Sequence, residues 1–265
     1  DQWSLTLPKL HALTELVQEQ LQKGHIVPST SPWNSPVFVI KKQTGKWRLL
    51  HDLRKINAVM EDMGALQPGL PSLTMIPQNW HLTVIDLKDC FFDIPLHPED
   101  TPKFAFSVPS TNMQAPLQRY HWVVLPQGMK NSPTICQWFV AKILSPIRLD
   151  MPDTFLYHYM DDILIAAEKQ EVMEKALALV SDAVTQAGLC VGPEKIQHQP
   201  PWKYLGWQIR TQSISPQPLQ IQTNISTLHD AQKLFGTINC VHPLLRISNT
   251  DLSPLFALLK GEPDL

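Results

Sequence analysis

The spacing of hydrophobic residues predicts alternating helices and strands along most of the chain. Between Thr6 and Gly24, leucine and valine recur every three to four residues, which is typical of an amphipathic helix capped by Thr6. Hydrophobic runs at 37–40 and 47–50, joined by a polar turn at 43–45, predict a β-hairpin. The other expected elements are strands at 82–86, 104–108, 120–125 and 203–209, a hairpin at 155–166, and helices at 133–147 and 170–187.

Two stretches complete the predicted architecture. Residues 61–80 are rich in Pro and Gly and are expected to be irregular, whereas the last fifty residues are expected to form helices. The mixture of elements predicts an α+β fold, with helices on one face of a sheet. With 265 residues, of which 43% are hydrophobic, the chain can form one large domain or two smaller ones, and the composition excludes general disorder.

The composition also narrows the class of protein. A net charge of −2 argues against a protein that coats nucleic acid through bulk charge, although a local basic groove remains compatible with it. The sequence contains neither a signal peptide nor an apolar run long enough for a bilayer, and its four cysteines are scattered. These features predict an intracellular protein with reduced thiols, and the absence of an initiator Met suggests a fragment.

Adjacent aspartates interrupt the hydrophobic hairpin at 155–166. Neighbouring like charges such as Asp161 and Asp162 raise a pKa or require a cation, although an ordinary turn is the more frequent explanation for this dipeptide alone. Asp86 ends another buried strand and could lie beside the hairpin on the same sheet. Three converging carboxylates would form an oxygen-rich site for Mg²⁺, and a pair of such ions serves phosphoryl transfer.

Six motifs in a fixed order make this hypothesis more specific. They are SPWNSPVFVIKK, LQPGLP, DLKDCFF, LPQGMKNSPTICQ, YMDD and YLGWQI. With these motifs the sequence resembles a retroviral reverse transcriptase from about Gln2 to the C-terminus, most closely the betaretrovirus branch, which includes endogenous elements of type K. The resemblance implies a right-hand polymerase with fingers at 1–61 and 94–131, a palm at 62–93 and 132–212, and a partial thumb at 213–265. The connection and ribonuclease H regions of the family would be missing from this chain.

The resemblance implies an RNA-directed DNA polymerase, a nucleotidyltransferase of the Pol polyprotein. Asp86 and Asp161 would hold two Mg²⁺ ions, with Mn²⁺ as an alternative, and Asp162 would complete the acidic set. The primer 3′-hydroxyl would attack the α-phosphate of a deoxynucleoside triphosphate, with pyrophosphate leaving. The implied partners are an RNA or DNA template–primer, dNTPs, and either further copies of the chain or the rest of Pol, with no membrane. The setting would be the cytoplasm or a viral particle.

The family pattern also implies contacts with the nucleotide. These residues are Lys42, Arg48, Asp89, Cys90, Phe91, Gln127 and Gly128. Arg48 would contact the base and α-phosphate, and Lys42 the γ-phosphate, although Lys41 is one position away and stays an alternative. The plain alternative for these hairpin charges is a solvated surface. Phe91 would exclude a ribose 2′-hydroxyl by steric clash, or else belong to the core beside Phe92.

A further group of residues is implied to contact the template or primer. It comprises Lys130, Tyr159, Met160 and the primer-grip residues Tyr204, Leu205, Gly206 and Trp207. Lys195 matches a lysine near the triphosphate or the sheet edge. An amphipathic strand and a surface lysine are the structural alternatives. Trp33, Trp47 and Trp80 could stack on bases, but core packing is the commoner role of tryptophan.

Two other function classes remain open from the sequence. A catalytically idle remnant or subunit would bind nucleic acid or partner chains without turnover, and a two-metal nuclease or phosphatase would use the acids on another fold. The near-neutral charge of the segment after Gln212 predicts a weak grip on a phosphate backbone and therefore low processivity.

Overall fold

The computed structural model describes residues 2, 5–42, 44–64, 71–110 and 114–217, together with 230, 232, 234–236, 238 and 252. The chain divides into two compact units. The first contains residues 1–76 and 80–196, and the second contains residues 77–79 and 197–265. Most of the predicted C-terminal helices, and most of the predicted thumb, lie outside the described residues.

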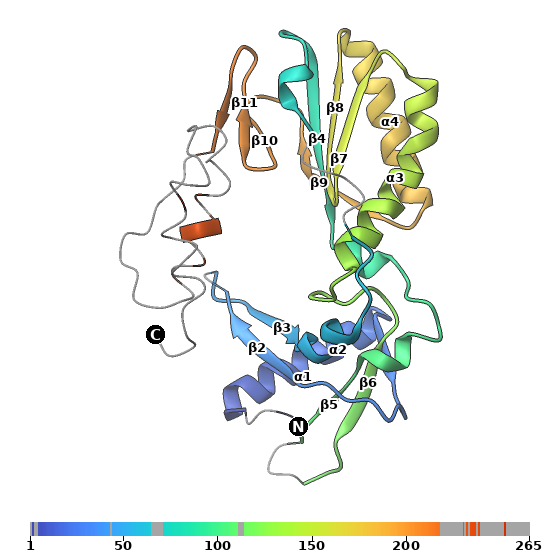
Figure 1. The fold of residues 1–265 in the computed structure, drawn as a ribbon, viewed down its shortest axis with the longest axis vertical. Coiled ribbons are helices and arrows are strands. Elements are labelled where there is room, and N and C mark those ends of the chain that lie inside the picture. Colours follow the sequence, from blue (N-terminus) through green and yellow to red (C-terminus); the bar gives the residue numbers. More distant parts are fainter. Residues whose placement is uncertain are drawn as a thin grey trace. The chain divides into compact units, whose positions relative to one another are not determined.

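A four-stranded sheet organises one part of the first unit (Figure 1). Its strands are β4 (His81–Lys88), β7 (Phe155–Tyr159), β8 (Asp162–Ala167) and β9 (Cys190–Gln197), in the order β7-β8-β4-β9. The pairings β7–β8 and β8–β4 are antiparallel. Residues 163–167 of β8 are completely buried, because this strand is central and packs against helices.

Helices α3 (Ser132–Asp150) and α4 (Gln170–Gln186) cover the same face of this sheet (Figure 1). Cys136, Val140 and Leu144 on α3 are completely buried, because residues four apart lie on one helical face. Val180 and Val184 on α4 follow the same spacing. The predicted mixture of helices and strands, with helices on one face of the sheet, is confirmed.

The remainder of the first unit contains two smaller sheets and two further helices. Strands β2 (Val37–Lys41) and β3 (Trp47–His51) form the predicted hairpin, and a three-stranded sheet has the order β1-β6-β5. The other elements are α1 (Leu7–Gln22), α2 (Arg54–Val59), β1 (Ile26–Pro28), β5 (Ala105–Val108), β6 (Gln118–Trp122) and the 3₁₀ turns η1 (Leu73–Met75), η2 (Cys90–Asp93) and η3 (Thr101–Phe104).

The second unit contains a small antiparallel sheet. Its strands are β10 (Trp202–Tyr204), β11 (Trp207–Ile209) and β12 (Ile214–Pro216). The single strand predicted at 203–209 is therefore wrong. Leu205 and Gly206 both have positive φ angles, 47° and 82°, which are typical of the two-residue turn that joins a twisted hairpin.

Several boundaries differ from those predicted. Thr6 occupies the N-cap position of α1, but its side chain makes no capping hydrogen bond. Helix α3 continues past Pro146 to Asp150, and Ile147 in this last turn is buried. Strands β1 and β9 and helix α2 were not expected, because they are short or contain Gly and Pro.

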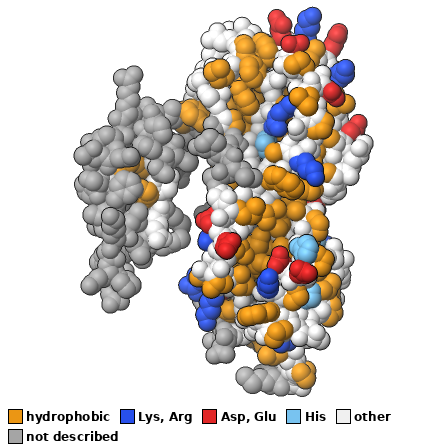
Figure 2. Space-filling model, turned by 45° about the vertical axis from the view of Figure 1, so that its right-hand side comes forward, with side chains coloured by type: hydrophobic (Ala, Val, Ile, Leu, Met, Phe, Trp, Pro, Cys, Tyr) orange, Lys and Arg blue, Asp and Glu red, His pale blue; other side chains and the backbone are white. Residues whose placement is uncertain are grey.

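Hydrophobic side chains also reach the surface of the molecule. Trp33, Val59 and Leu149 are among those that are largely exposed, and Figure 2 shows hydrophobic side chains gathered across the middle of the face that it presents. Among the described residues, no helix combines the length and apolar character needed to cross a bilayer.

Candidate active site

Strand pairing brings the three predicted catalytic aspartates together. Asp86 on β4 lies directly opposite Asp162 on β8 in the antiparallel register. Asp161 occupies the tight turn between β7 and β8, and its carbonyl oxygen accepts a hydrogen bond of 2.8 Å from the backbone N–H of Leu87. Residues separated by 75 positions in the sequence therefore meet at one end of the two central strands of the sheet.

The turn that carries Asp161 is held in an unfavourable backbone conformation. Tyr159 pairs with Asp162, so the loop contains only Met160 and Asp161, and Met160 has a φ angle of 54°. A left-handed conformation at a residue other than Gly costs of order 1–3 kcal/mol and persists only where its surroundings impose it. The N–H group of Met160 donates a hydrogen bond to Oε1 of the buried Gln137, which anchors the turn to α3.

A buried polar network extends this anchor. Arg148 Nη2 lies 2.8 Å from His158 Nδ1, while His158 Nε2 lies 3.2 Å from the carbonyl oxygen of Gln137. Since arginine can only donate, His158 accepts at Nδ1 and donates from Nε2, which fixes a neutral tautomer. Burial, together with the charge of Arg148, lowers the pKa of His158 and favours the same neutral form.

Gln137 was not identified from the sequence. A usable signal exists, because Gln137 is a polar residue beside the buried stripe of a predicted helix. Such a residue requires a hydrogen-bond partner, and here its partners lie in and next to the turn that carries Asp161.

The carboxylates experience one another's charge. Burial and the charges of Asp161 and Asp86 raise the pKa of Asp162 to about 6. The Asp161 side chain reaches solvent, yet partial burial of its carboxyl group and the charge of Asp86 raise its pKa as well. The fold therefore brings the carboxylates of the aspartates close enough for each negative charge to disfavour the others.

A lysine binds one of the three acids directly. Nζ of Lys195, on β9, lies 2.6 Å from Oδ2 of Asp86. In the described part of the chain, no three acidic, His or Cys side chains are already arranged as a metal-binding group. The donor set nevertheless fits a hard divalent cation, because it consists of carboxylate oxygens whose repulsion such a cation would relieve.

Four predicted nucleotide residues line a shared pocket in the first unit. A cavity of about 360 Å³ is lined by Lys42, Arg48, Asp89 and Gln127, among others. Nη2 of Arg48 donates a hydrogen bond of 2.6 Å to Oε1 of Gln127 and so connects the β2–β3 hairpin to the loop before α3. The two segments are 79 positions apart in the sequence.

The neighbouring lysines of the hairpin have different surroundings. Lys42 lines this cavity, whereas Nζ of Lys41 lies 6.0 Å from the centre of the Trp47 ring, a cation–π arrangement. This difference favours Lys42 over Lys41 as a phosphate contact.

The segment around η2 combines core and surface positions. Asp89 is exposed and has a φ angle of 51°. Cys90 is buried with its sulfur 3.0 Å from that of Cys136, and the contact with Cys136 together with burial raises the pKa of Cys90. Phe91 is partly buried against the core, while Phe92 stacks on Trp122.

Helix α2 is connected to the loop that carries Gln127 and Gly128. Nδ2 of Asn57 donates to the carbonyl oxygen of Gly128 at 2.8 Å, and Oδ1 of Asn57 accepts from the N–H of Lys130 at 2.9 Å. Nζ of Lys130 donates to the carbonyl oxygen of Met60. Gly128 has a φ angle of 92°, so this loop requires glycine at that position.

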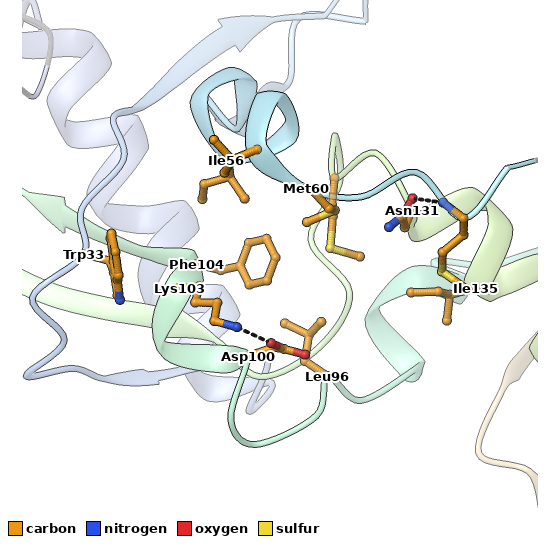
Figure 3. A pocket seen from close by; sticks show the side chains of 12 residues that line it. Trp33, Ile56, Met60, Leu96, Asp100, Lys103, Phe104, Asn131 and Ile135 are labelled. Carbon is orange, nitrogen blue, oxygen red and sulfur yellow. Dashed lines mark hydrogen bonds and ion pairs between the residues drawn. The ribbon is translucent and has the colours of Figure 1, made fainter.

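An apolar pocket lies beside the same helix (Figure 3). Its volume is about 550 Å³, and Ile56, Met60 and Phe104 contribute to its apolar lining. The ion pair of Asp100 with Lys103 lies at this pocket (Figure 3). None of the predicted catalytic or nucleotide residues lines it.

The predicted primer-grip residues belong to the second unit. Tyr204 is buried, Leu205 and Gly206 form the turn, and Trp207 begins β11. In the first unit, Tyr159 and Met160 are partly buried beside the acids. Of the tryptophans considered for base stacking, Trp33 is exposed, Trp47 is partly buried against the core, and Trp80 contacts the Phe155 ring.

Comparison with known proteins identifies the family. The family model described as "Reverse transcriptase (RNA-dependent DNA polymerase)" matches residues 40–209. The chain belongs to the reverse transcriptase family. A second model, "Reverse transcriptase thumb domain", matches residues 216–265 of the same chain. The family resemblance predicted from the six motifs is therefore confirmed, and it implies a polymerase fold.

Similarity to viral polyproteins, over almost all of this chain, supports the same assignment. The chain is 54% identical over 263 residues to the Gag-Pro-Pol polyprotein of mouse mammary tumor virus (strain BR6), and 55% identical over 263 residues to that of simian retrovirus SRV-2. These alignments cover 99% of this chain but 15% of each polyprotein. The expected similarity to betaretroviral sequences is confirmed.

Proposed function

We propose that this chain is the polymerase part of a retroviral Pol protein and catalyses RNA-directed DNA synthesis. The observation that carries the proposal is the register of β4 and β8, which sets Asp86 opposite Asp162 and next to Asp161. The family match supports the reaction type, and the polyprotein relatives support a cytoplasmic or viral-particle setting. The fingers, palm and partial-thumb boundaries predicted from the sequence belong to the same proposal.

In this proposal the three aspartates hold divalent ions. Carboxylates of Asp86 and Asp161 would be the principal ligands, and Asp162 would add negative charge and remain adjacent to them. Bound Mg²⁺ or Mn²⁺ would supply electrostatic stabilisation of the attacking and leaving oxygens during phosphoryl transfer. The hydrogen bond from Met160 to Gln137 would keep Asp161 in position for this role.

The residues around the 360 Å³ cavity would bind the incoming nucleotide. Arg48 and Lys42 would contact its phosphates. Arginine offers a planar fork of hydrogen-bond donors, whereas lysine offers a compact point charge. Gln127 would orient Arg48 through their hydrogen bond. The backbone of Asp89, Cys90 and Gly128, and the Phe91 ring, would complete the pocket as the family pattern implies.

The partner would be an RNA or DNA template–primer. Lys130, Tyr159 and Met160 would contact it from the first unit, and the β10–β11 hairpin with Tyr204, Leu205, Gly206 and Trp207 would contact the primer from the second. Lys195 would lie near the triphosphate. The duplex itself would be recognised mainly by shape and backbone, while base pairing supplies the sequence.

A primer-extension assay tests the proposal. A labelled DNA primer on an RNA template is incubated with dNTPs and Mg²⁺, using wild-type protein, Asp161→Asn and the exposed control Asp182→Asn on α4. We expect extension by the wild type and the control, and a loss of about a thousandfold or more in Asp161→Asn, because several kcal/mol of transition-state stabilisation disappear. Extension that persists undiminished in Asp161→Asn would refute the proposal. Tight template–primer binding without any incorporation would instead favour an idle remnant.

A further inference from the structure

The contact between Lys195 and Asp86 connects a basic residue on β9 to the acidic set. The two side chains of the 2.6 Å ion pair retain exposures of 42% and 35%, so the pair is only partly shielded from solvent. Strand β9 lies next to β4 in the sheet, and this places Lys195 beside Asp86, one of the proposed metal ligands.

The charge of Lys195 acts on more than its direct partner. It opposes the repulsion among the acids and lowers the pKa values of both Asp161 and Asp162, although burial and the acids themselves outweigh it. Lys195 is therefore a counterion for the whole group of three aspartates. Its positive charge therefore weakens the electrostatic attraction of the three carboxylates for a divalent cation.

A role in stability alone does not account well for this arrangement. Ion pairs with this exposure contribute about 0–1 kcal/mol to folding, because solvent screens them and two side chains lose freedom. The same interaction has a larger consequence locally, because every cation that binds Asp86 must compete with the ammonium group for the carboxylate.

We propose that Lys195 is a built-in counterion that competes with divalent cations for Asp86 and leaves this carboxylate when they bind. The inference rests on the proposed function, in which the acids hold such ions. It adds that the chain limits metal occupancy in the absence of substrate. A nucleotide would offer Lys195 a phosphate as an alternative partner, so nucleotide binding and metal binding would favour each other.

Direct measurement of Mn²⁺ binding tests this role without relying on turnover. Free Mn²⁺ is quantified by electron paramagnetic resonance during titration of the full chain, in the absence of nucleotide and template–primer. The variants are Lys195→Met, Lys195→Arg, and Lys175→Met on the exposed side of α4 as a control for net charge. We expect Lys195→Met to bind Mn²⁺ roughly three- to fivefold more tightly, with the other two variants near the wild type.

Thermal unfolding provides a second readout. In EDTA, Lys195→Met should melt below the wild type because the acids lose their counterion, and saturating Mn²⁺ should remove this deficit. A purely structural lysine would give a deficit that Mn²⁺ does not remove. Lys195→Gln replaces Lys195→Met if the methionine variant does not fold.

The outcomes separate this inference from the proposed function. Unchanged or weaker Mn²⁺ binding in folded Lys195→Met overturns the inference, and so does binding that Asp86→Asn leaves unaffected. Primer extension by the same wild-type preparation tests the proposed polymerase independently. A protein that extends primers but shows no gain of Mn²⁺ affinity in Lys195→Met would retain the function and lose the counterion role.

Discussion

The two longer hairpins of the first unit provide opposite kinds of support for their functional side chains. The β7–β8 hairpin has a two-residue loop, a completely buried second strand from Ile163 onward, and a hydrogen bond from Met160 to Gln137. The β2–β3 hairpin buries Val37 and Val39 on one face and leaves its lysines exposed. The first hairpin is packed closely around its turn, whereas the second exposes its cationic side chains to solvent.

This difference suggests a division of labour. Acids that must hold ions at defined positions need a fixed backbone, whereas cations that meet a charged ligand can remain flexible until it arrives. Substitutions that loosen β7–β8 should therefore reduce the rate of catalysis. Substitutions in β2–β3 should chiefly weaken nucleotide binding.

Among substitutions that leave the aspartates in place, the largest expected effect concerns the anchor of the turn that carries Asp161. Gln137→Leu removes the acceptor of the Met160 N–H, and an unsatisfied group of this kind costs about 1–3 kcal/mol. We expect kcat to fall about tenfold or more while KM for dNTP changes by less than about twofold. Steady-state primer extension measures both constants.

The matched control is Gln186→Leu, the same change at an exposed position of α4. It should leave both constants near their wild-type values. An unchanged kcat in folded Gln137→Leu would show that the turn does not need this anchor.

A smaller effect should separate the adjacent lysines of the β2–β3 hairpin. Lys42→Ala should raise KM for dNTP about tenfold, because a charged phosphate contact of about 1.5 kcal/mol is lost. Lys41→Ala should change KM much less, since Lys41 does not line the cavity and its ammonium lies near the Trp47 ring. Equal KM values in the two variants, or a larger effect at Lys41, would reverse the assignment.

Arg48→Ala should raise KM at least as much as Lys42→Ala, because it removes both the cation and the contact with Gln127. Arg48→Lys should recover only part of the loss, since lysine lacks the planar fork of arginine. A large fall in kcat with KM unchanged would contradict the division between the hairpins.

The smallest expected effect is on stability and depends on pH. The pKa of Asp162 is raised to about 6, so between its ordinary value of 3.8 and pH 6 the folded protein keeps a proton that the unfolded chain has lost. Above pH 6 the folded state bears the full cost of the buried charge. Asp162→Asn should therefore raise the Tm of the metal-free protein by about 2–4 °C for each kcal/mol removed at pH 7–8.

This gain should shrink as the pH falls below 6 and vanish below pH 3.8, where Asp162 becomes protonated in both states. Thermal unfolding in EDTA across this range measures it. A gain in Tm that is independent of pH would place its cause elsewhere than in the carboxylate charge.

The sequence predicted the elements that carry the three aspartates well because their signals are local. Short stretches of sequence suffice to predict the buried strands, the apolar arms around Asp161 and the periodic helices at 133–147 and 170–187. The same pattern indicated that Asp86, at the end of another buried strand, could lie beside the hairpin on a shared sheet, and the antiparallel register of β4 and β8 places it there.

What the sequence could not provide are contacts between distant segments. Neither the bond from Arg48 to Gln127 nor the ion pair of Lys195 with Asp86 follows from periodicity, because each depends on how separate elements pack. At 203–209 the hydrophobic pattern predicted one continuous strand, whereas the resemblance to a primer grip implied the hairpin whose turn lies at Leu205. Most residues assigned to the thumb lie outside the part of the chain that the structure describes.

The most direct test of the central claim is the location of bound metal. Crystals of the full chain with template–primer, a non-reacting dNTP analogue and Mn²⁺ would show the ions by anomalous scattering. We expect Mn²⁺ peaks within about 2–2.5 Å of carboxylate oxygens of Asp86 and Asp161. Anomalous peaks bound elsewhere, with these two carboxylates uncoordinated, would contradict the account.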